Sequence, residues 1–121
     1  GQITSNGANN TTSYNTSSDY RLKTNVSSIT DGIARVKNLK PYQFEWKSDL
    51  GTKVDGFFAH EAQTVVPESV VGTKDEVDSD GKPKYQGIDQ AKLVPVLTAA
   101  LQEAIAEIEI LKTKVSALEG S

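Results

Sequence analysis

Apolar residues recur with a regular heptad spacing in the last third of the chain. Between residues 94 and 118 the intervals alternate between three and four, which is typical of a coiled-coil helix. The apolar positions are Val94, Leu97, Leu101, Ala104, Ile108, Leu111, Val115 and Leu118. We expect the helical pattern to begin at Asp89, with Pro95 either in the first turn or at a kink.

The charges that flank this apolar seam favour a parallel association of identical helices. With residues 101, 108 and 115 at heptad position a, the charged neighbours are Glu107 and Lys114 at position g, and Lys112 and Glu119 at position e. In a parallel arrangement each g residue faces an e residue of the neighbouring helix five positions further on. Both resulting pairs combine opposite charges.

The periodicity does not fix the number of helices. Isoleucine at a with leucine at d favours two strands, whereas Ile105 at position e widens the apolar stripe and favours three or more. A single amphipathic helix that lies on its own domain is the alternative interpretation. Such helices, however, follow a period nearer 3.6 than 3.5 residues.

Shorter periodic segments predict a small mixed body before this helix. Thr30 is a candidate N-cap for a short helix with Ile33, Val36 and Leu39 on one face, which Pro41 should end.

Alternating aromatic and polar residues predict a strand over 42–46, which we expect to pair with 54–59 across a polar turn over 48–53. A short helix over 60–66 should end at Pro67. The next strand, at Val70 and Val71, leads into a charged hairpin whose turn lies at Asp80–Gly81. The predicted fold class is α+β: a small globular body with short strands, a β-hairpin and short helices, followed by a long C-terminal helix.

Composition limits the kinds of function that are open to the chain. Its 121 residues suffice for one modest domain, and a net charge of −3 argues against a nucleic-acid-binding surface. No apolar run reaches the ~18–20 residues of a membrane span. With no cysteine and a single histidine, thiolate and multi-histidine metal sites within one chain are excluded. We therefore expect no metal, no cofactor, no nucleic acid and no membrane partner.

The first seventeen residues differ in character from the rest. They carry no charge, and thirteen of them are Ser, Thr, Asn or Gly. Such a stretch is either a flexible linker or the end of a polar, β-rich element that lies upstream. The charged part of the chain starts at the pair Ser17–Ser18.

The stretch "SSDYRLK" (17–23) offers one chemical possibility. A serine hydroxyl is a poor nucleophile unless a base takes its proton, and Lys23 could be that base if burial or a neighbouring cation such as Arg21 lowered its pKa. Ser18 could then attack the carbonyl carbon of Ser17, to which it is already tethered. On these residues alone, a turn or helix cap at Ser18 and Asp19 is the simpler interpretation.

Three blocks of sequence resemble the peptidase S74 family, the C-terminal intramolecular chaperone domains of bacteriophage tailspikes and tail fibres. The blocks are "SDYRLKTNV" (18–26), "GFFAHEAQTVVPESV" (56–70) and "YQGIDQAKLVPVLTAALQEAIAEIEIL" (85–111). They occur in the family's order. His60 and Phe58 stand where the family often has Gln and Ile, which leaves a role for His60 open.

The resemblance implies that the chain helps a trimeric fibre or spike to fold and then cuts itself off. It implies Ser18 as nucleophile, Lys23 as general base and Ser17–Ser18 as the scissile bond. Further candidates for supporting the site are Asp19, Arg21, Asn25, His60 and Glu61. For Glu61 we expect a structural role, in which it binds backbone amides at a helix start.

The same resemblance predicts the organisation and the partners of the chain. Residues 1–17 would be the end of the upstream fibre, 18–92 the chaperone body, and 93–121 the helix of a parallel trimeric coiled coil. The partners would be two further copies and the upstream part of the same chain. Assembly would take place in the cytoplasm of a bacterial host, with the upstream part retained in the phage tail and the cleaved domain released.

Two alternatives remain at this stage. One is a non-catalytic trimerisation domain of a fibrous protein. The other is the self-cleaving domain of a transcription factor, against which the Ser/Thr/Asn-rich upstream segment argues.

Overall fold

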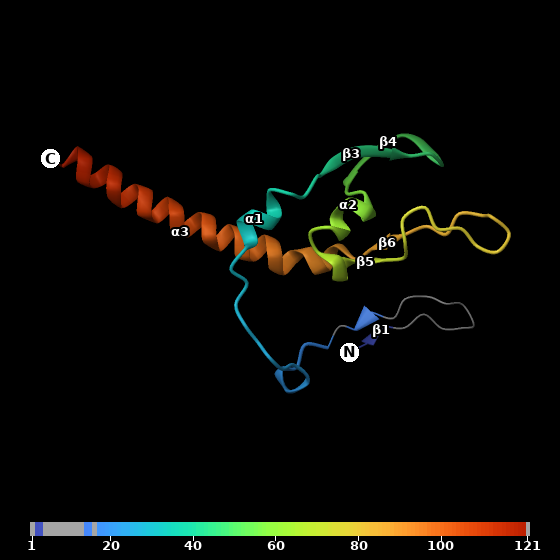
Figure 1. Cartoon of the computed structure of the whole chain (residues 1–121). Helices are drawn as coiled ribbons and strands as arrows, with labels where there is room; N and C mark the ends of the chain where they lie inside the picture. Colours follow the sequence, from blue (N-terminus) through green and yellow to red (C-terminus); the bar gives the residue numbers. More distant parts are fainter. Residues whose placement is uncertain (1, 4–13, 16, 121) are drawn as a thin grey trace.

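The structure is a computed structural model that describes residues 2–3, 14–15 and 17–120, and it has the predicted α+β class. Short strands and short helices form a body at one end of a long C-terminal helix (Figure 1). In chain order the elements are β1 (Gln2–Ile3), β2 (Tyr14–Asn15), η1 (Tyr20–Leu22), α1 (Gly32–Val36), β3 (Tyr42–Trp46), β4 (Asp49–Gly56), α2 (Ala59–Gln63), η2 (Pro67–Ser69), β5 (Val70–Val71), β6 (Gly87–Ile88), η3 (Gln90–Leu93) and α3 (Val94–Glu119).

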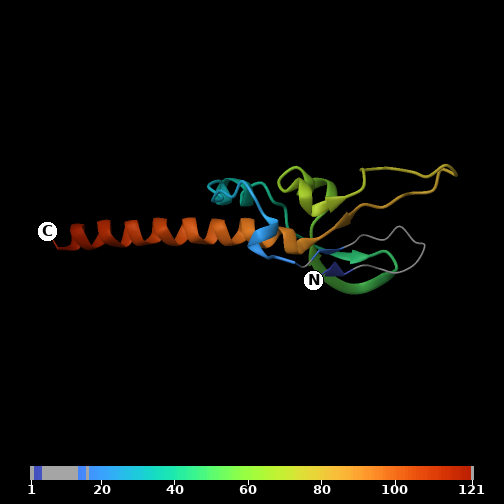
Figure 2. The same ribbon diagram turned by 90° about the horizontal axis from the view of Figure 1, so that it is seen from below.

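Within the described residues the strands form three two-stranded antiparallel sheets, which pair β1 with β2, β3 with β4, and β5 with β6. The β3–β4 and β5–β6 hairpins extend away from the body in the direction opposite to the C-terminal end of α3, as both ribbon views show (Figure 2). The hairpins and the long helix therefore occupy opposite ends of the molecule.

The β3–β4 hairpin is tighter than we predicted. The turn consists of residues 47 and 48, and β4 starts at Asp49 and ends at Gly56, so the polar turn predicted over 48–53 and the strand predicted over 54–59 are wrong in their limits. The cause is a bulge: Trp46 pairs with Asp49, whereas Glu45 pairs with Lys53. Two-residue turns are favoured in hairpins, and the extra residues are accommodated in the bulge instead.

Helix α1 is capped differently from our prediction. The residue before the helix is Asp31 and not Thr30, and Asp31 makes no side-chain cap. Instead the carboxylate of Glu103, on α3, accepts hydrogen bonds from the first two backbone N–H groups of α1. Leu39 lies beyond the helix, which ends at Val36.

Helix α2 is shorter than the predicted segment 60–66. Val66 has φ −132° and ψ 82°, outside the helical region, because Pro67 follows it. Pro67 then begins the 3-10 helix η2. The hairpin beyond it has the predicted turn, in which the Asp78 carboxylate accepts hydrogen bonds from the backbone N–H groups of Asp80 and Lys82.

The buried core is small and joins the body to the long helix. Its central cluster consists of Val66, Leu93 and Val96, each at most 2% exposed. The half-buried residues that pack around it are Val36, Phe57, Val65 and Ile88. Because Leu93 and Val96 belong to η3 and α3, the start of the helix is part of the body's core.

The long helix extends well beyond this core. Pro95 lies in the first turn of α3, which is one of the two positions that we predicted for it. The 26 residues of α3 span about 39 Å at 1.5 Å per residue. Every described residue of α3 after Ala104 is exposed, and this part of the helix projects from the body (Figure 2). The association of α3 in a parallel trimer stays a prediction.

Among the described residues, no helix combines the length and the apolar character that crossing a membrane requires.

The core predicts how the domain responds to truncation of one side chain. We expect Leu93→Ala to lower the free energy of unfolding by about 2–5 kcal/mol, because it leaves a cavity in the core between η3 and Val66. Leu50→Ala is the matched control: Leu50 is 77% exposed, so the change should stay within about 0.5 kcal/mol. Denaturant unfolding at one fixed chain concentration measures both. Equal effects of the two substitutions would contradict this description of the core.

Candidate functional site

The segment that carries Ser18 and Lys23 folds as one tight turn. Asp19 precedes η1, and its carboxylate accepts a hydrogen bond of 2.9 Å from the backbone N–H of Arg21. The backbone N–H of Lys23 donates to the carbonyl of Tyr20 at 3.1 Å, which closes the turn. Aspartate favours such turns because its side chain binds the backbone two residues on. The local sequence therefore explains this fold.

The turn brings the side chains of Ser18 and Lys23 together. Lys23 Nζ donates a hydrogen bond to Ser18 Oγ over 2.7 Å, within the same chain. A catalytic base has to lie within this reach of the nucleophile from which it takes a proton. The two residues thus have the contact that a Ser-Lys pair requires.

The charge of Arg21 is directed at Asp19. The guanidinium donates two hydrogen bonds to the Asp19 carboxylate, from Nε at 2.9 Å and from Nη2 at 2.8 Å. These bonds lower the pKa of the Asp19 carboxyl and raise the pKa of Arg21. Because Asp19 balances this positive charge, Arg21 is less effective as a cation acting on Lys23 than the sequence alone suggested.

The body of the same chain does not shield this site from water. All residues from 17 to 31 are exposed, and the side chains of Tyr20 and Leu22 are 81% and 72% exposed. In Figure 1 the blue segment around residue 20 stands apart from α2 and α3. Asn25 has φ +53°, a left-handed conformation that asparagine tolerates, and it redirects the chain just after Lys23.

Glu61 does not bind backbone amides at the start of α2, so this part of our prediction is wrong. Helix α2 has no side-chain cap. The Glu61 carboxylate hydrogen-bonds with the Tyr42 hydroxyl, which raises the pKa of that tyrosine, and it lies 3.9 Å from Lys40 Nζ. Glu61 Oε1 is buried without a hydrogen-bond partner among the described residues.

His60 lies on α2, with its ring stacked on Phe58 at 6.0 Å between centroids. Figure 1 shows α2 well separated from the segment that carries Ser18 and Lys23. Within one chain the structure therefore brings Ser18, Lys23, Asp19 and Arg21 together, but it does not bring His60 to them.

The predicted coiled-coil seam lies on the side of α3 that the body leaves exposed. Ala104 is half-buried, and the exposed members of the seam are Val94, Leu97, Leu101, Ile108, Leu111, Val115 and Leu118. The buried residues of the helix are Val96, Ala99 and Ala100, which belong to heptad positions c, f and g. The heptad seam is therefore not the face with which the helix packs on its own body.

Residues 18–71 match the sequence model of the Peptidase_S74 family, described as chaperone of endosialidase. Residues 18–71 therefore form an S74 domain of this family. The match begins at Ser18, the first residue of the tight turn, and ends at Val71 in β5, so it contains both members of the Ser-Lys contact. No curated protein matches the chain. The family gives this S74 domain a chaperone role, and its name connects the domain with peptidase chemistry.

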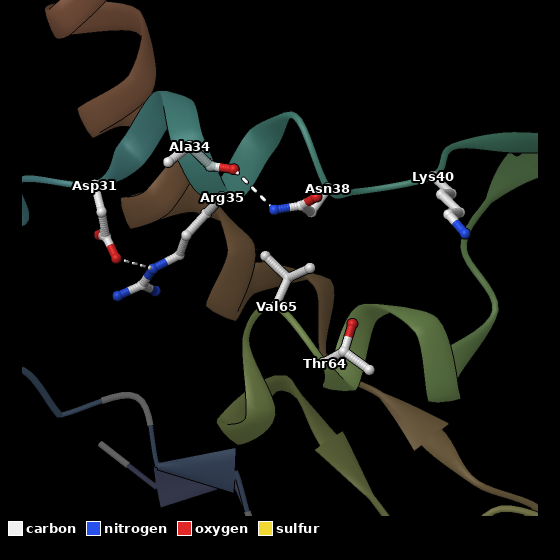
Figure 3. A pocket seen from close by; sticks show the side chains of 7 residues that line it. All are labelled: Asp31, Ala34, Arg35, Asn38, Lys40, Thr64 and Val65. Atoms are coloured by element: carbon white, nitrogen blue, oxygen red, sulfur yellow. Dashed lines mark hydrogen bonds and ion pairs between the residues drawn. The ribbon is translucent and has the colours of Figure 1, made fainter.

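The S74 domain has an open hollow between α1 and α2 that sequence reasoning did not find. Its volume is about 540 Å³, and its lining residues are Asp31, Ala34, Arg35, Asn38, Lys40, Thr64 and Val65 (Figure 3). Asp31 binds Arg35 at 3.0 Å, and the Asn38 side chain donates to the carbonyl of Ala34 at 3.1 Å. None of the residues predicted to take part in cleavage lines this hollow. No signal in the sequence indicates it, because its two walls are distant along the chain.

In the part of the S74 domain that the structure describes, no group of three or more His, Cys, Asp or Glu residues is arranged to hold a metal ion.

The ion pair of Asp19 with Arg21 predicts a measurable titration. The lowered pKa of Asp19 means that the turn favours the ionised carboxylate, so the pair persists as the pH falls through the usual carboxyl range and is lost only below it. In Arg21→Gln the Asp19 pKa should rise towards its usual value. NMR titration of the side-chain carbons in a Ser18→Ala background measures this.

Asp75 provides the internal control for this titration. Its pKa is lowered by Lys74, so Arg21→Gln should leave it unchanged. An Asp19 pKa that is the same with and without Arg21 would contradict the ion pair.

Proposed function

We propose that this S74 domain assembles three identical chains through α3 and then cuts the Ser17–Ser18 bond, with Ser18 as nucleophile and Lys23 as general base. The observation that carries the proposal is the 2.7 Å contact between Lys23 Nζ and Ser18 Oγ, which favours action within one chain. Residues 1–17 would remain with an upstream fibre or spike, while residues 18–92 and the helix over 93–121 would leave as the chaperone.

The proposed reaction has two steps. Neutral Lys23 takes the proton of Ser18 Oγ, which attacks the carbonyl carbon of Ser17 through a five-membered ring. The C–N bond of the Ser17–Ser18 peptide breaks, the nitrogen takes a proton, and an ester links Ser17 to Ser18 Oγ. Water then attacks this ester, which leaves a carboxylate on Ser17, a free amino terminus on Ser18 and the Ser18 hydroxyl restored.

The exposure of α3 supports assembly through its heptad seam. The body covers positions c, f and g near the start of the helix, which leaves positions a and d for neighbouring chains. A shallow apolar hollow of about 420 Å³ also lies along the seam at Ile108, Leu111 and Val115. The e and g charges favour parallel chains, and Ile105, 45% exposed at position e, favours three.

Assembly would also complete the cleavage site. Deprotonation of a lysine at neutral pH is favoured by removal of water, yet the dyad is exposed in the single chain. The exposed side chains of Tyr20 and Leu22 beside it are suited to packing against another chain. Cleavage would then follow assembly and mark its completion. Pairing distant β strands is slow, so holding three chains in register would help an upstream fibre to fold.

The setting that fits this function is the assembly of a bacteriophage tail fibre or tailspike in the cytoplasm of its bacterial host. The upstream part of the chain would be retained in the phage tail. The alternative is a non-catalytic domain that only registers three chains of a fibre.

Substitution of the dyad separates these two functions. In a time course of cell-free synthesis followed by intact mass, the wild-type chain should give a fragment that begins at Ser18. Ser18→Ala should lower the cleavage rate by at least about 10³-fold, because the nucleophile is removed. Lys23→Ala should do the same, and so should Lys23→Arg, since a guanidinium keeps the charge but does not accept a proton.

The solution mass of each variant is the control for folding, and all of them should remain trimers. A wild-type trimer whose chains stay uncut would support the non-catalytic alternative. A Lys23→Arg chain that is cut at the wild-type rate would exclude lysine as the base.

The assembly face has a matched pair of isoleucines for its own test. We expect Ile108→Lys to abolish the trimer at micromolar chain concentration, because it places three charges at position a of the seam. Ile110 is similarly exposed, at 56% against 50% for Ile108, but lies at position c, so Ile110→Lys should leave the trimer intact. Light scattering measures both masses. Loss of the trimer in both variants, or in neither, would contradict the seam.

A further inference from the structure

The catalytic segment, which carries Ser18 and Lys23, leads into α1, and the first turn of α1 is fixed to α3, the assembly helix. Helix α1 begins at Gly32, directly after the exposed segment 24–31 that follows Lys23. Glu103 Oε2 accepts a hydrogen bond from the backbone N–H of Gly32 at 2.8 Å, and Oε1 accepts one from Ile33 at 3.3 Å. We call this pair of bonds the Glu103 clamp.

The contact at Gly32 is too close for any other residue. A Cβ atom on Gly32 would lie 2.4 Å from the backbone nitrogen of Ala100 and 2.6 Å from Glu103 Oε2. Backbone atoms do not yield as a flexible side chain does, so the first turn of α1 rests directly on the backbone of α3. Gly32 is accordingly buried, although the residues before it are exposed.

The carboxylate of Glu103 suits this position electrostatically. The first N–H groups of a helix have no partner within the helix and carry partial positive charge, so a negative group there is stabilising. Asp31, the adjacent acid, is engaged with Arg35 Nε at 3.0 Å and does not cap α1. Glu103 therefore supplies the acceptor that the neighbouring sequence does not.

The clamp and the seam lie on the same turn of α3. Glu103 is at heptad position c, next to Ala104 at d and two residues after Leu101 at a. Three chains that align their seams therefore also align the points at which their catalytic segments leave the helix.

We propose that Glu103 is a positioning residue for the cleavage, which fixes the catalytic segment to the assembly helix. The proposal rests on the proposed self-cleavage. Without the clamp, the unattached length after Lys23 grows from residues 24–31 to as much as 24–35, from eight residues to twelve, because Val36 stays packed against the core. Effective concentration falls with about the −3/2 power of linker length. In the trimer, the segment would therefore contact the surface of the neighbouring chain that excludes water from it about twofold less often. Loss of its fixed direction adds to this effect.

The test compares three substitutions on α3 in the whole chain. Glu103→Ala should slow first-order cleavage within the trimer by at least about twofold and speed hydrogen exchange at the amides of Gly32 and Ile33. Glu103→Gln keeps one acceptor without the charge, and its rate should lie between those of Glu103→Ala and the wild type. The control is Glu109→Ala, a change of an exposed glutamate at position b, which should leave the rate and the exchange unchanged.

A variant with a weaker core separates positioning from general stability. Leu93→Ala lowers stability without touching the clamp, so at a temperature where it remains trimeric it should cleave faster than Glu103→Ala. All variants should have the mass of a trimer, because none of the substitutions changes the residues of the heptad seam beyond residue 105.

The outcomes distinguish failure of the positioning role from failure of the proposed function. Cleavage of Glu103→Ala at the wild-type rate, in trimers, would overturn the role of Glu103 and leave the proposed function intact. So would equal slowing of Glu103→Ala and Leu93→Ala, since that would indicate stability alone. A wild-type trimer that never cuts would overturn the proposed function, and the positioning role with it.

Discussion

The structure depends on the way in which one helix packs against its own body with one face and leaves its heptad seam available for the proposed assembly. Near the start of α3, Val96, Ala99 and Ala100 at heptad positions c, f and g are buried against the body, while the residues at a and d are exposed except for the half-buried Ala104. The two demands do not conflict because small residues, Ala99 and Ala100, allow the close approach of Gly32 on one side. Larger apolar side chains then remain available on the other side. The body would thus sit outside a bundle of parallel helices.

Parts of this arrangement follow from the sequence, since their signals are local and periodic. The long helix was predictable because eight apolar positions repeat without interruption, and β3 was predictable from three alternating aromatic residues. The cap of α1 was not, because its acceptor, Glu103, is separated from Gly32 by 71 positions along the chain. The limits of β4 also escaped prediction, since the bulge between Glu45 and Trp46 shifts the register without a clear turn signal.

The site shows the same contrast between local and distant interactions. Sequence reasoning alone could suggest a serine and a lysine five residues apart, but a turn or helix cap was the simpler interpretation, and the choice of a catalytic pair rested on the family resemblance. The structure adds the 2.7 Å contact and the pairing of Arg21 with Asp19. Glu61 could not have been assigned from its place at a helix start, because its partners Tyr42 and Lys40 come from a neighbouring strand and the segment before it.

In the proposed cleavage, the geometry of the reaction is separate from its control. The Ser18–Lys23 contact needs only a six-residue turn that Asp19 and the backbone of Lys23 close, so it can exist before any assembly. In the single chain this contact lies in open water, because all residues from 17 to 31 are exposed. In the proposed function, assembly would exclude water from the dyad, and this would depend on where the segment is fixed relative to other chains. A locally formed nucleophile that remains inactive until distant surfaces meet would couple cutting to assembly without any change in the dyad itself.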